Sequence, residues 1–295
     1  MKVLYDEAYQ AYRRSVEDAL ETFLPARDGD ILFDSMRYSL FAGGKRLRPV
    51  LTLAWCDLCG GNGRSALPGA AAVEMVHTYS LIHDDLPCMD NDTLRRGKPT
   101  NHVIYGEYVA LLAGSGLYDR ALATLTDRSA EYGLSDLQIL ESVRCLCRAA
   151  GTDGILTGQV LDMRNADTTV DRAYLEKVNA YKTASMLQAA CELGCIAAGA
   201  DLPVRLSARR FGELLGQAFQ IRDDILDVTG NAASLGKTPG KDSAESKVTF
   251  VDLLGVEGAQ KEVLRLSEEA QSLLASFAGS DFLTELVRRM CRREN

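Results

Sequence analysis

The sequence has little of what marks several protein classes. Its 295 residues include one tryptophan, three histidines and seven prolines, and strand-like alternation of apolar and polar residues is nearly absent. No apolar run approaches the roughly 20 residues that span a bilayer. The first residues, MKVLYDEAYQAY, are acidic and lack the apolar core of a signal peptide. We therefore expect a protein without a membrane span that works in the cytoplasm.

The chain also has no excess of positive charge. Its formal net charge is −8 at pH 7, whereas proteins that bind nucleic acid present net basic faces to the phosphate backbone. This charge argues against nucleic acid as a partner. It would also repel an anionic substrate, so local Lys and Arg side chains and bound metal must reverse the field at any anion site.

Paired cysteines are scarce as well. Among the eight cysteines, only Cys56 and Cys59 form a CxxC pair. No second such pair and no pair of histidines stands at the distance that a zinc finger needs. We expect no structural zinc, and we expect the cysteines to be thiols of a reducing compartment.

Helical periodicity dominates what is present. It predicts two helices before residue 42, separated by the turn PARDGD, and a third that begins near Pro49. The run that follows Pro68 is apolar on most of its circumference, as in a helix buried inside a bundle. Further helices are expected at about 107–125, 135–149, 151–165, 172–199, 205–229, 257–277 and 280–293. We predict one all-α domain over 1–295, with a polar loop at 229–247 that could order over bound phosphate.

Two clusters of aspartates are the most informative feature. They are Asp84, Asp85, Asp90 and Asp92 in HDDLPCMDND, and Asp223, Asp224 and Asp227 in IRDDILD. Carboxylates this close repel one another, and an all-oxygen set of acidic ligands is what Mg²⁺ selects. Each cluster is embedded in apolar sequence, which surface acids rarely are. A metal ion is therefore expected between them.

Helical spacing adds further ligands to these clusters. His77 and Asp84 are two helical turns apart and share one stripe. Gln220, Asp223 and Asp227 form a second stripe, and Gln159 with Asp162 in GQVLDM forms a third. Basic side chains able to hold phosphate oxygens accompany them. These are Lys45, Arg46 and Arg48 in GGKRLRP, Arg95 and Arg96 in LRRGKPT, and Lys182, Lys237, Lys241 and Lys247. Acidic clusters with interspersed bases indicate a metal-bridged diphosphate.

Taken together, these motifs resemble one family over nearly the whole chain. The matching stretches are GGKRLRP at 43–49, VHTYSLIHDDLPCMDND at 76–92, LRRGKPTNH at 94–102, GQVLDM at 158–163, KTAS at 182–185 and FQIRDDILD at 219–227. The chain is similar to short-chain trans-prenyl diphosphate synthases, the farnesyl and geranylgeranyl diphosphate synthases. The resemblance implies a single helical bundle around a central cavity, a homodimer, and two substrates, isopentenyl diphosphate and an allylic diphosphate.

The resemblance also implies roles for individual residues. Three Mg²⁺ ions, for which Mn²⁺ can substitute, would be held by Asp84, Asp90, Asp162, Asp223 and Asp227, with Asp85 and Gln159 in support. The allylic diphosphate would contact Arg95, Lys182, Thr183, Gln220, Lys237 and Lys247. Isopentenyl diphosphate would contact Lys45, Arg48, His77 and Arg96. The catalytic set would comprise Asp84, Asp85, Asp90, Arg95, Lys182, Asp223 and Lys237.

The chemistry of such a reaction accounts for this inventory. Cleavage of an allylic C–O bond leaves a carbocation and pyrophosphate, and fixed positive charge stabilises the pyrophosphate as it departs. An apolar cavity must then keep water from the cation, and Tyr79, Ser80 and Phe219 can line it. The sequence departs from the family pattern at Thr93, Ser115 and Ser246, and none of the three is assigned to metal or diphosphate.

Alternatives remain for the activity and its product. A class I terpene cyclase would share the first aspartate motif but would not need GGKRLRP, and a non-catalytic subunit would have lost a motif. Tyr79 lies five residues before Asp84, where a bulky ring should stop growth at farnesyl diphosphate, with geranylgeranyl diphosphate as the alternative product. The apolar run at 107–125 is a candidate for the dimer surface, or is ordinary core.

Overall fold

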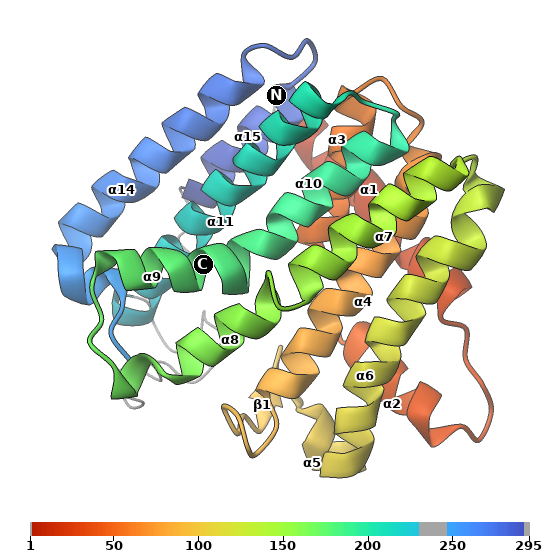
Figure 1. Cartoon of the computed structure of the whole chain (residues 1–295), viewed down its shortest axis with the longest axis horizontal. Helices are drawn as coiled ribbons and strands as arrows, with labels where there is room; N and C mark the ends of the chain where they lie inside the picture. The colour runs from red at the N-terminus through yellow and green to blue at the C-terminus, as the bar shows by residue number, and fades with distance from the viewer. Residues whose placement is uncertain (1, 230–246, 292–295) are drawn as a thin grey trace. The chain divides into compact units, whose positions relative to one another are not determined.

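The computed structural model describes residues 2–229 and 247–291. The all-α prediction is confirmed (Figure 1). In the described ranges, the only strands are β1 (Leu94–Arg95) and β2 (Lys98–Pro99), which pair antiparallel as a short hairpin. No helix within these ranges is long and apolar enough to cross a membrane.

The chain divides into two compact units. Unit 1 comprises Met1–Leu146 with Leu193–Ala200, and unit 2 comprises Cys147–Glu192 with Asp201–Asn295. The boundaries fall inside α7 (Asp136–Ala150) and α10 (Ser185–Ala197), so these two helices belong partly to each unit. The single domain expected over 1–295 stays a prediction.

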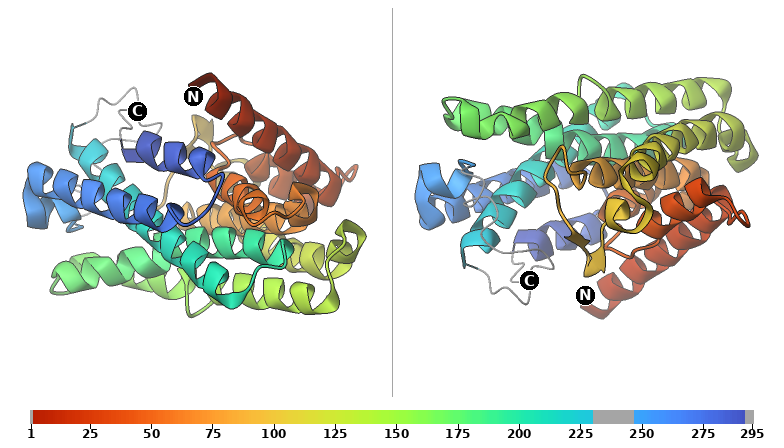
Figure 2. Two further views of the ribbon diagram at one scale, coloured as in Figure 1. Left: turned by 90° about the horizontal axis from the view of Figure 1, so that it is seen from above. Right: turned by 90° about the horizontal axis from the view of Figure 1, so that it is seen from below.

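Unit 1 is built around one buried helix. Besides the hairpin and parts of α7 and α10, its elements are α1 (Lys2–Phe23), α2 (Ile31–Leu40), α3 (Leu47–Leu58), α4 (Leu67–Asp84), α5 (Asn101–Tyr105), α6 (Glu107–Ala123) and the short turns η1 (Gly63–Ala66), η2 (Thr124–Arg128) and η3 (Ser129–Tyr132). Helix α4 is buried on most of its circumference, as its sequence predicts. It packs against α1, α3 and α6 (Figure 1), and α1 and α3 also lie side by side (Figure 2).

The hairpin of unit 1 follows from two residues in left-handed backbone. Arg96 and Gly97 link β1 to β2 with φ of 53° and 74°, the signs that a two-residue hairpin loop of type I′ requires. The Tyr38 hydroxyl donates to the Pro99 carbonyl over 2.8 Å. The buried Asn101 amide donates to the Ser35 carbonyl over 2.9 Å. These bonds hold the hairpin and the start of α5 against α2.

Unit 2 contains two long helices and a set of shorter ones. Its elements are α8 (Ile155–Met163), η4 (Asn165–Asp167), α9 (Arg172–Asn179), the π-turn η5 (Ala180–Ala184), α11 (Leu202–Thr229), α14 (Phe250–Leu274) and α15 (Asp281–Cys291). Helices α11 and α14 pack along one another, with α15 against both (Figures 1 and 2). A capping box between Thr249 and Asp252 starts α14. The helix predicted over 172–199 is interrupted by the π-turn, which periodicity alone did not show.

Candidate active site

The glycine-rich loop that precedes α3 places neighbouring basic residues in different environments. Gly43 and Gly44 have φ of 94° and 126°, and Arg46 has φ of 54°. The Arg46 side chain is fully buried, and its guanidinium pairs with Glu17 and Glu74, each over 2.8 Å. Lys45 is exposed. Arg46 is therefore a structural residue, and Lys45 is the one that can reach a ligand.

Arg96 reaches this loop from the hairpin. Its guanidinium donates a hydrogen bond to the Gly43 carbonyl. Gly44 has a backbone conformation that favours glycine, and a Cβ atom there would lie 2.8 Å from the Arg96 Cζ atom, so the guanidinium would have to shift. Burial lowers the pKa of Arg96, as do the charges of Arg46 and Arg95, although Glu74 opposes them. Arg96 and the loop that carries Lys45 are thus in direct contact, and their role in binding isopentenyl diphosphate stays a prediction.

Arg48 and His77 lie together on α3 and α4. The distance from Arg48 Nη1 to His77 Nε2 is 3.2 Å. Because a guanidinium can only donate, Nε2 accepts and the ring proton sits on Nδ1. Burial, then the charges of Arg48 and Arg96, hold the pKa of His77 well below its usual value. The ring is thus neutral, and its contact orients Arg48. The Ser80 hydroxyl donates to the His77 carbonyl over 2.9 Å.

The first aspartate motif folds back on itself at the end of α4. The Asp90 N–H donates to the Asp84 carbonyl over 2.9 Å, which brings these two predicted metal ligands together. Both are partly exposed, whereas Asp85 is buried. Arg95 Nε donates to both Asp85 carboxylate oxygens, over 2.7 and 2.8 Å. Burial lowers the pKa of Arg95, but the hydrogen bond and charge of Asp85 more than offset this, whereas burial raises the pKa of Asp85 in spite of Arg95.

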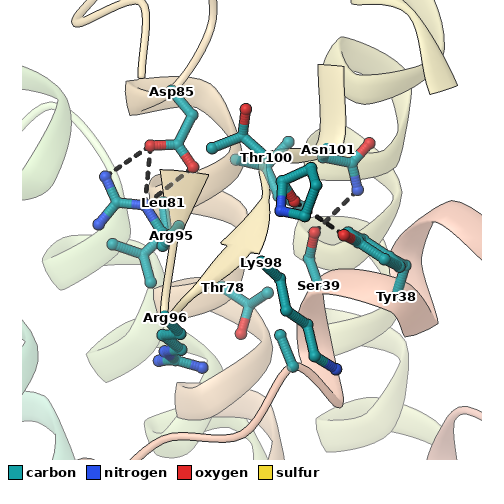
Figure 3. A pocket seen from close by; sticks show the side chains of 13 residues that line it. Tyr38, Ser39, Thr78, Leu81, Asp85, Arg95, Arg96, Lys98, Thr100 and Asn101 are labelled. Carbon is teal, nitrogen blue, oxygen red and sulfur yellow. Dashed lines mark hydrogen bonds and ion pairs between the residues drawn. The ribbon is translucent and has the colours of Figure 1, made fainter. Parts of the chain in front are cut away.

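A small pocket lies beneath the hairpin (Figure 3). It is lined by side chains of α2, α4, α5 and the hairpin, including Tyr38, Leu81, Arg96 and Lys98. The buried Thr78 hydroxyl lines it and has no hydrogen-bond partner in the described part of the chain. The pocket adjoins the Asp85–Arg95 pair, so it belongs to the site that the first motif builds.

In unit 2 the structure brings together three predicted residues from distant motifs. Lys182 Nζ and Lys247 Nζ lie 2.7 and 3.2 Å from the same Asp162 carboxylate oxygen. Burial alone would raise the pKa of Asp162, but the two ammonium groups hold it below the ordinary value. The Asp162 carboxylate thus already pairs with two cationic groups, as a metal ligand would pair with a metal ion.

The π-turn that carries Lys182 packs closely against two glycines of neighbouring helices. A Cβ atom at Gly158 of α8 would lie 2.2 Å from the Lys182 backbone nitrogen, and one at Gly216 of α11 would lie 2.6 Å from the Ala184 Cα atom. π-turns inside helices are frequent at functional sites. Here the turn supplies Lys182 and Thr183 from consecutive positions.

The second aspartate motif divides into exposed and buried members. Asp223 and Asp227 are partly exposed. Asp224 is 6% exposed and accepts from Gln220 Nε2 over 3.0 Å and from the Phe250 N–H over 3.2 Å. The Thr183 hydroxyl in turn donates to the Gln220 side-chain oxygen over 3.0 Å. Gln220 therefore links Thr183 to a carboxylate that anchors the start of α14.

One further residue, Asn165, was not predicted from the sequence. Its side chain is buried and makes two hydrogen bonds to Val248, accepting from its N–H over 2.8 Å and donating to its carbonyl over 3.0 Å. This holds the backbone directly after Lys247. A lone asparagine outside any motif carries no pattern that could have revealed this.

The structure describes some of the remaining predicted residues and not others. Gln159 is buried, and its Nε2 atom has no hydrogen-bond partner in the described ranges. Lys237 lies outside the described residues. In residues 2–229 and 247–291, no three His, Cys, Asp or Glu side chains converge as a ready metal site. The roles predicted for the site residues therefore stay predictions.

Comparison with known proteins shows the family. The family model described as polyprenyl synthetase matches residues 30–275. A geranylgeranyl pyrophosphate synthase from Capsicum annuum is 46% identical over 264 residues, which are 89% of this chain and 71% of that protein. The large subunit 1 of a heterodimeric geranylgeranyl pyrophosphate synthase from Arabidopsis thaliana is 44% identical over 265 residues, with coverages of 89% and 71%.

Solved structures agree. An FPP/GFPP synthase from Zymomonas mobilis, in its apo form, matches with a TM-score of 0.88 and 32% identity, over 98% of this chain and 100% of that one. A geranyltransferase from Legionella pneumophila matches with a TM-score of 0.88 and 30% identity, over 99% and 98%. The fold is thus that of the isoprenoid synthases.

The chain belongs to the polyprenyl synthetase family. It is a prenyltransferase that condenses isopentenyl diphosphate with allylic diphosphates to linear trans-prenyl diphosphate.

Proposed function

We propose that farnesyl diphosphate is the main product of this chain, and Tyr79 carries the proposal. The Tyr79 ring is 8% exposed. Its centroid lies 5.0 Å from that of His83 and 5.7 Å from that of Tyr118 on α6. Burial raises the pKa of Tyr79, and the charge of Asp84 adds to this, so the hydroxyl stays neutral. The three rings form a bulky barrier between α4 and α6.

The position of this barrier sets the length of the product. Tyr79 precedes Asp84 by five residues on α4, which is about 7.5 Å along the helix axis at roughly 1.5 Å per residue. Side chains lean toward the helix N-terminus, which carries the ring deeper. A chain whose diphosphate is held at Asp84 would meet the ring as it grows, so elongation would stop at fifteen carbons.

The second candidate is geranylgeranyl diphosphate, which the names of the Capsicum and Arabidopsis relatives favour. Incubation with isopentenyl and dimethylallyl diphosphates, followed by chromatography of the dephosphorylated products, separates the two. We expect the fifteen-carbon product from the native chain and longer products from Tyr79→Met and Tyr79→Ala. A native enzyme that makes the twenty-carbon product, or variants with an unchanged product, would rule out Tyr79 as the barrier.

We also propose that the reaction requires Mg²⁺. The donor set fits, because Asp84, Asp90, Asp162, Asp223 and Asp227 offer carboxylate oxygens only. When bound, the metal would neutralise the departing pyrophosphate. The Asp162 carboxylate, now shared by Lys182 and Lys247, would turn to the metal and leave both ammonium groups for diphosphate. Chelation should abolish turnover and Mg²⁺ should restore it; turnover that persists in chelator contradicts this.

The substrates would divide between two basic surfaces. Lys45, Arg48, His77 and Arg96 would hold isopentenyl diphosphate. Arg95, Lys182, Thr183, Gln220, Lys237 and Lys247 would hold the allylic diphosphate. The Arg48–His77 and Arg96–Gly43 contacts support the first group. Lys45→Ala and Arg48→Ala should raise KM for isopentenyl diphosphate at least about tenfold, since charge-assisted contacts are strong and local. Equal effects on both substrates would contradict the partition.

A homodimer is proposed from the exposed apolar face of α5 and α6. Val103 and Ile104 are each 49% exposed, Leu111 is 47% exposed and Leu112 is 54% exposed. A second copy of the chain would cover this face. Sedimentation should give a dimer, and Leu112→Glu should give a monomer; a monomeric native chain contradicts the proposal. A cytoplasmic location is proposed because the cysteine pattern of the sequence suits thiols in a reducing compartment, although these plant relatives are named chloroplastic.

A further inference from the structure

The first helix contacts the loop that carries Lys45, although it lies outside the residues 30–275 that match the family. The Tyr9 hydroxyl of α1 donates to the Lys45 carbonyl over 2.7 Å. Burial raises the pKa of Tyr9 to about 12, with a further contribution from Glu74. The hydroxyl therefore keeps its proton and remains a donor across the working pH range.

A second residue of α1 holds the next position of the loop. Glu17 accepts from Arg46 Nε over 2.8 Å and from Nη2 over 3.2 Å. Arg46 also pairs with the buried Glu74 and donates to the Leu40 carbonyl over 2.7 Å. Arg46 thus spans from α1 to α4 beneath the loop.

This network has a reason in the backbone of the loop. Arg46 has φ of 54°, a left-handed conformation that residues other than glycine keep only where their surroundings enforce it. With Arg46 directed inward, Lys45 is directed outward and is exposed. The Tyr9 bond fixes the peptide between the two residues, so it fixes the direction in which Lys45 leaves the loop.

We propose that Tyr9 and Glu17 are positioning residues for isopentenyl diphosphate, acting through the loop that presents Lys45. This rests on the proposed role of Lys45. It makes α1 part of the substrate site rather than a packing element alone.

The chain offers a matched control for the test. Tyr12 lies on the same helix, one turn from Tyr9, and its hydroxyl donates to Asp57 over 2.7 Å. Tyr9→Phe and Tyr12→Phe each delete one phenolic hydroxyl and, with it, a 2.7 Å hydrogen bond that leaves α1. The bond of Tyr9 reaches the loop, whereas the bond of Tyr12 reaches Asp57 of α3, so a general effect of loosening α1 should appear in both variants.

Steady-state kinetics with each substrate varied in turn gives the readout. Tyr9→Phe should raise KM for isopentenyl diphosphate about three- to tenfold, the loss expected for one hydrogen bond. The allylic KM and kcat should be unchanged. Tyr12→Phe should leave both KM values at the native level. A Tyr9→Phe variant that behaves like Tyr12→Phe, or that raises both KM values equally, overturns the inference.

Lys45→Ala separates this inference from the proposed function. If Tyr9 acts through Lys45, the double variant Tyr9→Phe/Lys45→Ala should have the same KM as Lys45→Ala, because the two changes share one contact. Additive losses would mean that Tyr9 acts elsewhere. If Lys45→Ala itself leaves KM for isopentenyl diphosphate unchanged, the substrate partition is wrong and the inference falls with it. Glu17→Gln should raise the same KM; a native value removes Glu17 from the proposal.

Discussion

A single methyl group at Gly158 should separate Lys182 from Asp162. In Gly158→Ala, the added Cβ would lie 2.2 Å from the Lys182 nitrogen, 2.5 Å from its Cα atom and 2.7 Å from the Tyr181 carbonyl carbon. Ordinary contacts are about 3.5 Å, so the overlap exceeds about 1 Å. All three atoms belong to the backbone and cannot rotate away. Helix α8 and the π-turn must therefore move apart.

The cost follows from two opposing effects. Overpacking of this kind costs up to about 3 kcal/mol, and alanine gains about 1 kcal/mol over glycine inside a helix. The net loss of about 2 kcal/mol should lower Tm by about 4–8 °C. A shift of about 1 Å in a group that positions substrate can reduce turnover about 100-fold, and Lys182 would move by about this amount relative to the allylic diphosphate that we propose it binds.

Gly69→Ala is the control for Gly158→Ala. Gly69 also lies in a helix, α4, but its Cβ would lie 3.5 Å from Leu193 Cβ and 3.8 Å from Thr52 Cγ2, which are ordinary contacts. This variant should keep native turnover and a native or slightly higher Tm. Thermal melts and turnover assays on both variants decide the matter. If Gly158→Ala matches Gly69→Ala in both measurements, the close approach of α8 to the π-turn does not hold Lys182 in place.

Three other predictions concern the metal ligands, the Lys247 backbone and the histidine. Asp84→Ala and Asp223→Ala should each lower turnover about 10³-fold with a native melt; near-normal turnover in either would refute its role. Asn165→Ala removes both bonds to Val248 and should lower stability by about 1–3 kcal/mol and raise the allylic KM, whereas native values in melt and KM would contradict this. The pKa of His77 is lowered in the folded chain, so as the pH falls the unfolded chain takes up a proton at this residue before the folded chain does. The free energy of unfolding should therefore fall as the pH drops below about 6.5. His77→Gln should weaken this pH dependence of Tm, and an unchanged dependence would show that His77 does not cause it.

Much of the fold could be predicted because it depends on periodicity. The run after Pro68 is apolar around most of its circumference and forms the buried helix α4. The π-turn at 180–184 could not be predicted, because Tyr181 and Lys182 are ordinary helical residues. The turn depends on contact with Gly158, which lies in another helix. Asn165 shows the same limit, since its partner Val248 is 83 residues away.

Each of the two aspartate motifs contains a pair of adjacent carboxylates with different environments, which explains what the sequence could show of the site. Successive helical residues point about 100° apart, so two neighbouring carboxylates can lie in different environments. Asp85 and Asp224 are the buried members, and each is bonded within its own unit. Asp84 and Asp223 are partly exposed. The composition of the motif marks both aspartates as functional candidates, and their positions around the helix distinguish the two. Neutralising the buried aspartate should mainly lower stability. Neutralising its partly exposed neighbour should mainly lower turnover.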